Sequence, residues 1–248
     1  MKKYLSVLML HARSTLNKIL LIFAAMAGVE FFFFYRRLNT VSSAIDKESQ
    51  LSRSLGSILT DSRIHLVFLA VFLILTILLT LNGYEFKGKI SYTIRRLSIA
   101  EKCYFFLQGL YYSGVYLLFL MFQIFLIFLL STYYFRAVPE SYYSNQTLFT
   151  LFYSNDFLHS LLPLEETIRS VTNLIMTLAL GFSAAFSSYC QRGKSKRGGN
   201  IVVLTFLYAL TFQSGLGTYF YIVILTTSIT SLILIAFSML RKEERCDV

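Results

Sequence analysis

The stretch LVFLAVFLILTILLTLNGYEFKGKISYTIRRLSIAEK, Leu66–Lys102, decides the fold class of this chain. Its first half, Leu66–Tyr84, is an apolar run long enough to cross about 30 Å of hydrocarbon as a helix. Its second half, Glu85–Lys102, carries five lysines and arginines against two glutamates, and a second long apolar run, Cys103–Phe135, follows it. A short basic segment between two such runs is typical of a loop on the cytoplasmic face of a membrane.

The composition of the whole chain extends this pattern. Of its 248 residues 56% are hydrophobic and 15% are charged, and the mean hydropathy is +0.61. We therefore predict an all-α integral membrane protein with a single domain, since no segment outside the apolar runs is long enough to hold its own core. The net charge of +10 lies mainly in short loops between these runs, so it indicates membrane topology rather than nucleic-acid binding.

Six apolar stretches are predicted to span the membrane. They lie at about 19–35, 66–84, 104–130, 171–189, 201–216 and 219–240. Ahead of the first span, Met1–Lys18 mixes apolar and basic side chains and predicts an amphipathic helix lying in the membrane interface. If both termini are cytoplasmic, the inner segments hold 16 lysines and arginines and the outer segments hold 7, which supports that orientation.

The motifs of nucleotide and metal sites are incomplete in this sequence. Gly193-Lys194-Ser195 matches the end of a phosphate-binding loop, but Ser188 occupies the position of its first glycine. Histidine, cysteine and carboxylate residues are not grouped at the spacing that a zinc site needs. We expect this chain to bind no metal or cofactor and to perform no covalent chemistry.

Two acidic segments at predicted outer ends resemble fragments of a catalytic site. Glu165-Glu166 followed by Arg169 is a near match to the paired glutamates of CAAX-type intramembrane proteases, in which the arginine lies one residue later. An acidic helix start at the outer interface explains these glutamates better. Asp61 and His65 are four residues apart and are predicted to share a helix face as an interfacial polar pair.

A few polar residues interrupt the predicted spans. Glu30 lies in the outer half of the first span, where it is either a functional group or near enough to the interface to reach water or Arg36. Gln108, Gln123 and Asn173 either bridge helices by hydrogen bonds, which we favour, or line a pathway.

Small residues spaced four apart mark positions where helices approach closely in lipid. One such row is Ala24 and Gly28 in the first span, and a second is Ala179, Ser183 and Ser187 in the fourth. Each row fits either packing within the chain or a seam between two subunits.

The stretch YEFKGKISYTIRRLSIAEKCYFFLQG, Tyr84–Gly109, resembles the permease subunits of ABC-2 type transporters, as do the six spans and the cytoplasmic termini. In that family a glutamate ends the second span, a basic turn with glycine follows, and a Thr–Ile–Arg segment precedes Ser–x–x–x–Lys. The resemblance implies that this loop holds a coupling helix that docks on an ATPase subunit. The predicted docking residues are Glu85, Lys87, Gly88, Ile90, Ile94, Arg95, Arg96, Leu97, Ser98, Glu101 and Lys102.

The chemistry of this loop suits such a contact. An apolar ridge can form from Ile90, Ile94, Leu97 and Ile99. Positive charge flanks it at Arg95, Arg96 and Lys102. A basic interfacial helix held only by anionic lipid is the alternative.

The resemblance implies the membrane subunit of a bacterial ATP-driven exporter in the cell membrane. Two permease subunits, identical or paired with a sister chain, would pack around the pathway, and ATP and Mg would bind to partner ATPase subunits. The many Phe and Tyr residues suit an amphipathic or lipid-like substrate, such as an antimicrobial peptide. Two alternatives stay open: an intramembrane hydrolase, and a membrane immunity or assembly protein without a transport role.

Overall fold

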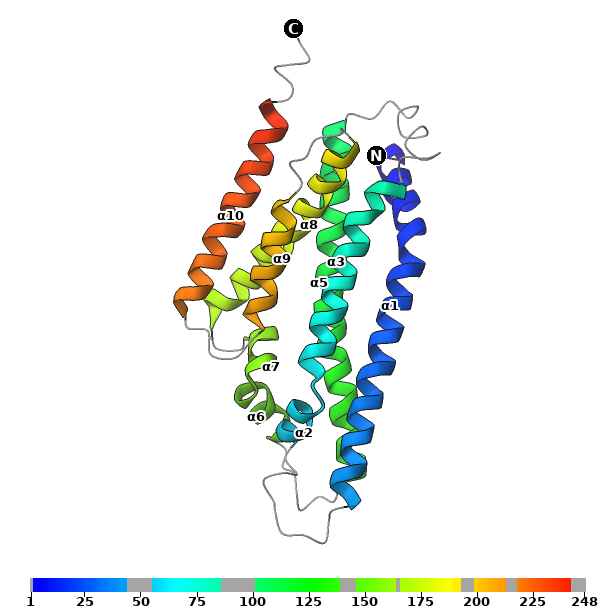
Figure 1. Cartoon of the computed structure of the whole chain (residues 1–248), viewed down its shortest axis with the longest axis vertical. Helices are drawn as coiled ribbons and strands as arrows, with labels where there is room; N and C mark the ends of the chain where they lie inside the picture. Colours follow the sequence, from blue (N-terminus) through cyan, green and yellow to red (C-terminus); the bar gives the residue numbers. More distant parts are fainter. Residues whose placement is uncertain are drawn as a thin grey trace.

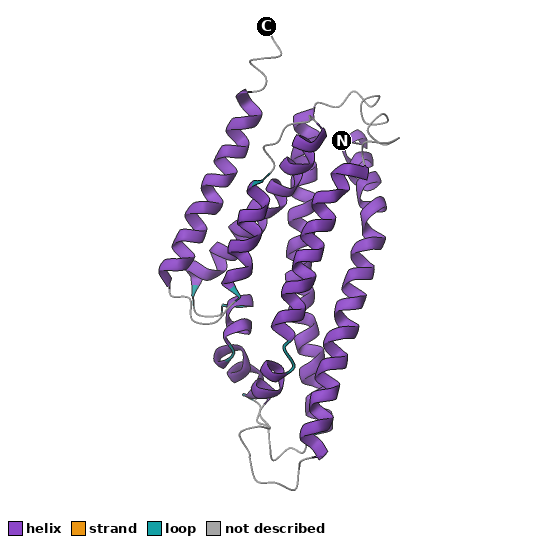
Figure 2. Cartoon of the chain, viewed as in Figure 1, coloured by secondary structure: helices purple, strands orange, loops and turns teal. Residues whose placement is uncertain are grey.

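The computed structural model describes residues 2–43, 55–85, 101–138, 146–163, 166–192, 199–212 and 218–241. Within these ranges the chain forms nine α-helices and no strand (Figure 2), as the predicted all-α class requires. The helices are α1 (Lys2–Ser43), α2 (Leu55–Asp61), α3 (Ile64–Glu85), α5 (Glu101–Ala137), α6 (Thr147–Ser154), α7 (Asp156–Leu161), α8 (Thr167–Arg192), α9 (Asn200–Thr211) and α10 (Thr218–Arg241).

Five of the six predicted spans form helices that are long and apolar enough to cross a membrane. Their apolar segments are Thr15–Thr40, Ile64–Leu81, Lys102–Ala137, Thr167–Cys190 and Tyr219–Met239. Large apolar side chains cover the outside of these helices, including Ile74 of α3, Met121 of α5 and Leu234 of α10, each more than half exposed. Such a surface is suited to lipid and not to water. The helices indicate a multi-pass membrane protein.

The stretch 201–216, predicted as the fifth span, forms a much shorter helix. Helix α9 has 12 residues, which correspond to about 18 Å at 1.5 Å per residue, less than the roughly 30 Å of a hydrocarbon core. It packs against α8, α10 and α3. Gly215 and Gly217 follow in the sequence, and glycine does not favour continuation of a helix. Among the described residues there are therefore five helices of membrane length, and the prediction of six such helices is not confirmed.

The N-terminal segment also differs from its prediction. Helix α1 runs over 42 residues without interruption, so no boundary at Lys18 separates an interfacial helix from the first span. At about 63 Å it is longer than a membrane core is thick. Its buried residues recur every three or four positions (Ile19, Phe23, Met26, Glu30, Phe34 and Leu38), and this stripe packs against α3 and α5.

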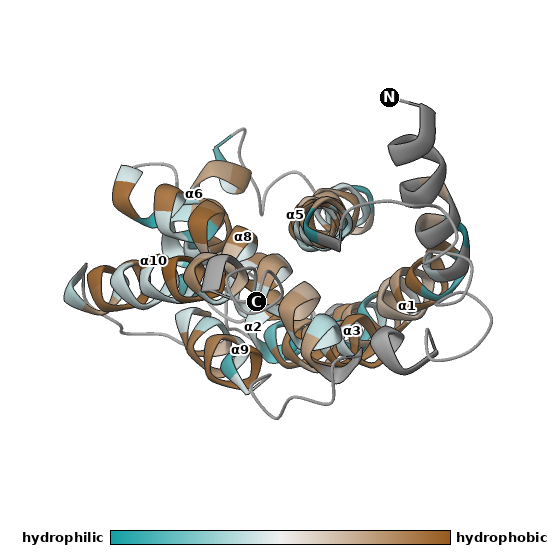
Figure 3. Ribbon diagram, turned by 90° about the horizontal axis from the view of Figure 1, so that it is seen from above, coloured by the Kyte–Doolittle hydropathy of each residue, from teal (hydrophilic) through white to brown (hydrophobic). Residues whose placement is uncertain are grey.

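Helix α8 lies at the centre of the arrangement and packs against α5, α10, α3 and α9. Figure 3 shows α1 and α10 at opposite edges of the bundle. Helices α5 and α8 approach closely at Gly181, where a Cβ atom would lie 2.7 Å from the Cα atom of Ser113. One turn away, a Cβ atom on Gly109 would lie 2.5 Å from Cδ1 of Phe182. Two glycines thus allow the close approach of α5 and α8.

The start of α1 and the end of α10 lie at one end of the bundle, and α2, α6 and α7 lie toward the other (Figure 1). Arg37 of α1 forms an ion pair with Asp61 of α2. Asn155, between α6 and α7, donates a hydrogen bond from Nδ2 to Oγ1 of Thr60 at 3.2 Å. The ion pair links α1 to α2, and the hydrogen bond joins the two long connecting segments that follow the first and third spans.

The predicted pairing of Asp61 with His65 on one helix face is wrong. The chain turns at Ser62 and Arg63, and Arg63 adopts a left-handed backbone with φ of 52°. Asp61 therefore ends α2 whereas His65 belongs to α3. The i, i+4 rule requires one continuous helix, and the turn removes that condition.

Candidate functional site

A carboxyl group is buried between two membrane helices. Glu30 of α1 and Gln123 of α5 are both 0% exposed, and Gln123 donates a hydrogen bond from Nε2 to Oε2 of Glu30 at 3.2 Å. Oε1 of Glu30 and Oε1 of Gln123 have no hydrogen-bond partner among the described residues. Glu30 lies on the inward stripe of α1, one turn from Met26 and one from Phe34, and so it faces α5. It does not reach outward to water.

The Glu30–Gln123 pair can hold two helices together, and it can accept hydrogen bonds from a further group. As it stands, the hydrogen bond fixes the register of α1 against α5, because a polar group in lipid is costly to leave without a partner. The two oxygens without partners also offer acceptors to a donor that enters between the helices. Ionisable groups inside membrane helices commonly mark functional sites. Glu30 and Gln123 are accordingly the strongest candidates within the bundle.

The other two polar residues singled out from the sequence have different neighbours. Asn173 of α8 donates from Nδ2 to the carbonyl oxygen of Ser160 in α7 at 2.8 Å, so it bridges two elements as predicted. Gln108 donates to the hydroxyl of Tyr112, four residues later in the same helix, at 2.9 Å. Gln123 and Asn173 therefore confirm the bridging prediction, and this contact of Gln108 lies within α5.

Tyrosine hydroxyls provide further links that the sequence analysis missed. The hydroxyls of Thr15 in α1 and Tyr111 in α5 are 2.7 Å apart, and Tyr116 of α5 donates to Oγ1 of Thr76 in α3 at 3.1 Å. With the contact of Gln123, three hydrogen bonds therefore join α5 to the neighbouring helices α1 and α3. Tyrosines in the middle of an apolar run, as at Tyr111 and Tyr116, are the sequence signal for such links, because a buried hydroxyl needs a partner.

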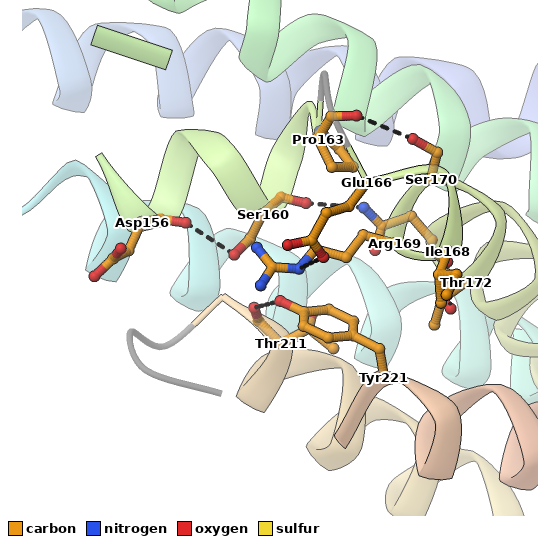
Figure 4. Close-up of polar contacts among 11 residues, drawn as sticks. Asp156, Ser160, Pro163, Glu166, Ile168, Arg169, Ser170, Thr172, Thr211 and Tyr221 are labelled. Atoms are coloured by element: carbon orange, nitrogen blue, oxygen red, sulfur yellow. Dashed lines mark hydrogen bonds and ion pairs between the residues drawn. The ribbon is translucent and has the colours of Figure 1, made fainter. Parts of the chain in front are cut away.

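The glutamate of the near match to a protease motif is engaged in an ion pair. Oε2 of Glu166 lies 2.6 Å from Nε of Arg169, and the Arg169 guanidinium stacks over the ring of Tyr221 in α10 at 4.6 Å. Figure 4 shows this group beside the hydrogen bond from Tyr221 to the carbonyl of Thr211. It joins the start of α8 to α9 and α10, which is a structural explanation for the acidic residue. Glu165 lies outside the described residues.

The remaining candidates for catalysis are dispersed. His159 contacts the ring of Tyr153 in α6, and His65 lies at the start of α3. Among the residues that the structure describes, no three His, Cys, Asp or Glu side chains are grouped in a way that could hold a metal ion.

The two rows of small residues have opposite environments. Ala179, Ser183 and Ser187 are buried in the chain, and the hydroxyl of Ser183 lies 3.4 Å from that of Ser231 in α10. Packing within the chain is confirmed for this row. Ala24 and Gly28 are exposed on α1, and a Cβ atom on Gly28 would meet nothing within 4 Å. Contact between subunits stays a prediction for that row.

Most of the predicted docking loop lies outside the described residues. Glu85 ends α3, Glu101 begins α5, and the side chain of Lys102 is exposed. The other predicted docking residues, which are Lys87, Gly88, Ile90, Ile94, Arg95, Arg96, Leu97 and Ser98, fall within 86–100, and their roles stay predictions.

Comparison with models of known protein families, with curated proteins and with solved structures gave no match.

Proposed function

We propose that this chain is the membrane-spanning subunit of an ATP-driven exporter of the ABC-2 type. One observation carries the proposal: the end of α3 and the start of α5, which flank the basic loop, lie at the same end of the bundle as the start of α1 and the end of α10 (Figure 1). Three segments rich in lysine and arginine, namely the start of α1, the loop that joins α3 to α5 and the residues after α10, therefore adjoin this end. This arrangement supports a cytoplasmic face at that end and both termini in the cytoplasm of a bacterial cell.

The packing of α3 and α5 supports a coupling role for the loop. Both helices pack against α1 and α8, and α8 in turn packs against α10. A partner that displaces the 86–100 loop would move the ends of two helices that reach the bundle core. The Thr15–Tyr111 and Glu30–Gln123 hydrogen bonds would transmit that motion to α1.

The other components follow from the same proposal. ATP and Mg are held by separate ATPase subunits, and this chain supplies no catalytic group. A second permease subunit, identical or a sister chain, packs beside it. The exposed Ala24 and Gly28 on α1 support a close approach of such a subunit, because small residues allow helix backbones to approach in lipid. The substrate class that we favour is an amphipathic peptide or a lipid-like molecule.

The proposal is tested by co-purification from the native host in mild detergent, with mass spectrometry of the proteins that elute. The wild-type chain is compared with an Arg95→Glu/Arg96→Glu variant. The matched control is Arg36→Glu/Arg136→Glu, which reverses two exposed charges on the outer parts of α1 and α5.

We expect an ABC-type ATPase with the wild type and with the control, and its loss with the loop variant. A wild-type sample without any ATPase would contradict the exporter proposal and favour a hydrolase or an immunity protein. Equal recovery of the ATPase by both variants would contradict docking through Arg95 and Arg96.

A further inference from the structure

A pocket of about 690 Å³ lies toward the end of the bundle that carries α2, α6 and α7 (Figure 1). Its walls are α2, the first part of α3, the junction of α6 with α7, and Phe212 after α9. Pockets that bind small molecules commonly have volumes of roughly 300–1,000 Å³. The size is thus that of a binding site for one small molecule.

The pocket is held open by contacts among its own walls. Asn155 accepts hydrogen bonds at Oδ1 from the backbone N–H groups of Phe157 and Leu158, and its Nδ2 reaches Thr60 across the pocket wall. Phe157 and Phe212 both pack edge-on against the fully buried Phe68, with ring centroids at 5.3 and 4.8 Å. The walls are therefore formed before any ligand binds.

The lining has an apolar floor and a polar rim. The floor consists of buried side chains, which are Leu59, Ile64, Phe157 and Phe212. The rim includes Ser57, His65 and Asp156, and the exposed Leu66 lies at the mouth. A ligand that fills this space must bring both an apolar part and a polar part.

Asp156 gives the rim its charge. It is the one carboxylate among the described lining residues, and neither lysine nor arginine is among them. The part of the chain that the structure describes offers no hydrogen bond or ion pair to its carboxylate, and in Figure 4 the Asp156 side chain points away from the Glu166–Arg169 pair. The neighbouring Arg63 is exposed and does not line the pocket.

We propose that this outer pocket binds a cationic amphiphile, an organic ammonium group on an apolar chain. The apolar chain lies on the Phe157 and Phe212 floor, and the ammonium group pairs with Asp156 at the rim. The proposal concerns binding alone and does not depend on the exporter function or on an ATPase partner.

The test uses the absence of tryptophan from this chain. A Leu66→Trp variant in phosphatidylcholine nanodiscs has a single tryptophan at the mouth of the pocket. Its emission is titrated with decyltrimethylammonium, with decanol and with decyl sulfate, all below micelle formation. A Leu73→Trp variant is the matched control, because Leu73 lies two turns deeper on α3, is exposed, and does not line the pocket.

We expect a saturable change in the emission of the Leu66→Trp protein with the cation. Adding Asp156→Asn to it should weaken cation binding about twofold to fivefold and leave decanol binding unchanged, since an exposed ion pair contributes up to about 1 kcal/mol. Unchanged decanol binding also shows that the pocket is intact in that variant. The proposal is overturned if Asp156→Asn leaves cation affinity unchanged, if decyl sulfate binds as tightly as the cation, or if the Leu73→Trp protein responds in the same way.

Discussion

Replacing Gly181 with alanine should separate the two central helices. At this position α8 lies so close to α5 that a Cβ atom would be 2.7 Å from the Cα atom of Ser113 and closer still to its backbone nitrogen. Carbon atoms make favourable contact at about 3.5–4.0 Å. The Oγ atom of Ser113 also lies in the way, but rotation of that side chain would not move the backbone atoms, so α5 and α8 must part by roughly 1 Å at this crossing.

The expected loss of stability is best measured against the same substitution at a second glycine. Gly114 lies in α5, and a Cβ atom there would meet nothing within 4 Å. Any gain in helix propensity on changing glycine to alanine, roughly 0.5–1 kcal/mol, applies at both positions and cancels in their difference. The difference in free energy of unfolding between the two variants is therefore the cost of overpacking at Gly181, about 1–3 kcal/mol. Gly109→Ala should lie between the two, because the obstacle there is the movable Phe182 ring.

Thermal unfolding in detergent can be followed through the buried thiol of Cys190, which lies in α8. A maleimide dye reports its exposure once Cys103 and Cys246 have been changed to serine. For a chain of this length about 2 kcal/mol corresponds to a difference in midpoint temperature of about 4–8 °C. Gly181→Ala should therefore unfold about that much below Gly114→Ala. Equal midpoints for these two variants would refute the close crossing of α5 and α8.

Three further predictions concern other parts of the chain. A double-mutant cycle of Glu30→Ala and Gln123→Ala should give a coupling energy of about 0.6 kcal/mol in SDS unfolding, the average for hydrogen bonds between membrane helices, and zero coupling would contradict the contact. In a cysteine-free background, Arg36→Cys should react with an impermeant maleimide in intact cells, and Lys102→Cys should react only after permeabilisation; the reverse pattern would contradict the proposed orientation. Asn155→Ala should lower the free energy of unfolding by about 1 kcal/mol because it removes the N-cap of α7, whereas Asn155→Asp, which keeps a capping oxygen, should stay near the wild type.

The membrane class and five of the spans could be predicted from the sequence, because apolar length is a local property. The turn at Arg63 was not predictable from the sequence, because no local sequence signal marks it. Neither proline nor glycine interrupts 57–65, and the left-handed backbone at Arg63 depends on how α2 packs against α1 and α6. The short α9 was predictable in part, since Gly215 and Gly217 precede the last span.

The periodicity of the first span predicts that Glu30 is buried, but it does not predict the partner of Glu30. Ile19, Phe23, Met26 and Phe34 repeat every three or four residues, and Glu30 occupies the same stripe. That periodicity places the carboxyl group on the inward face of α1. Its partner is 93 residues away on α5, and local patterns carry no information about which helix lies opposite.

The two small-residue rows show how a motif of one kind can serve two surfaces. Both allow backbones to approach, but the row in α8 contains Ser183 and Ser187, whose hydroxyls need partners in lipid, whereas Ala24 and Gly28 have no polar side-chain atom. Within this row Ser183 faces α10, where Ser231 lies within 3.4 Å of it and also accepts a hydrogen bond from Asn200 of α9 at 2.9 Å. A row without polar atoms can face lipid at no cost when a subunit is absent. Contact between subunits through the α1 row stays a prediction, whereas Ser183 of the α8 row has its neighbour within the chain.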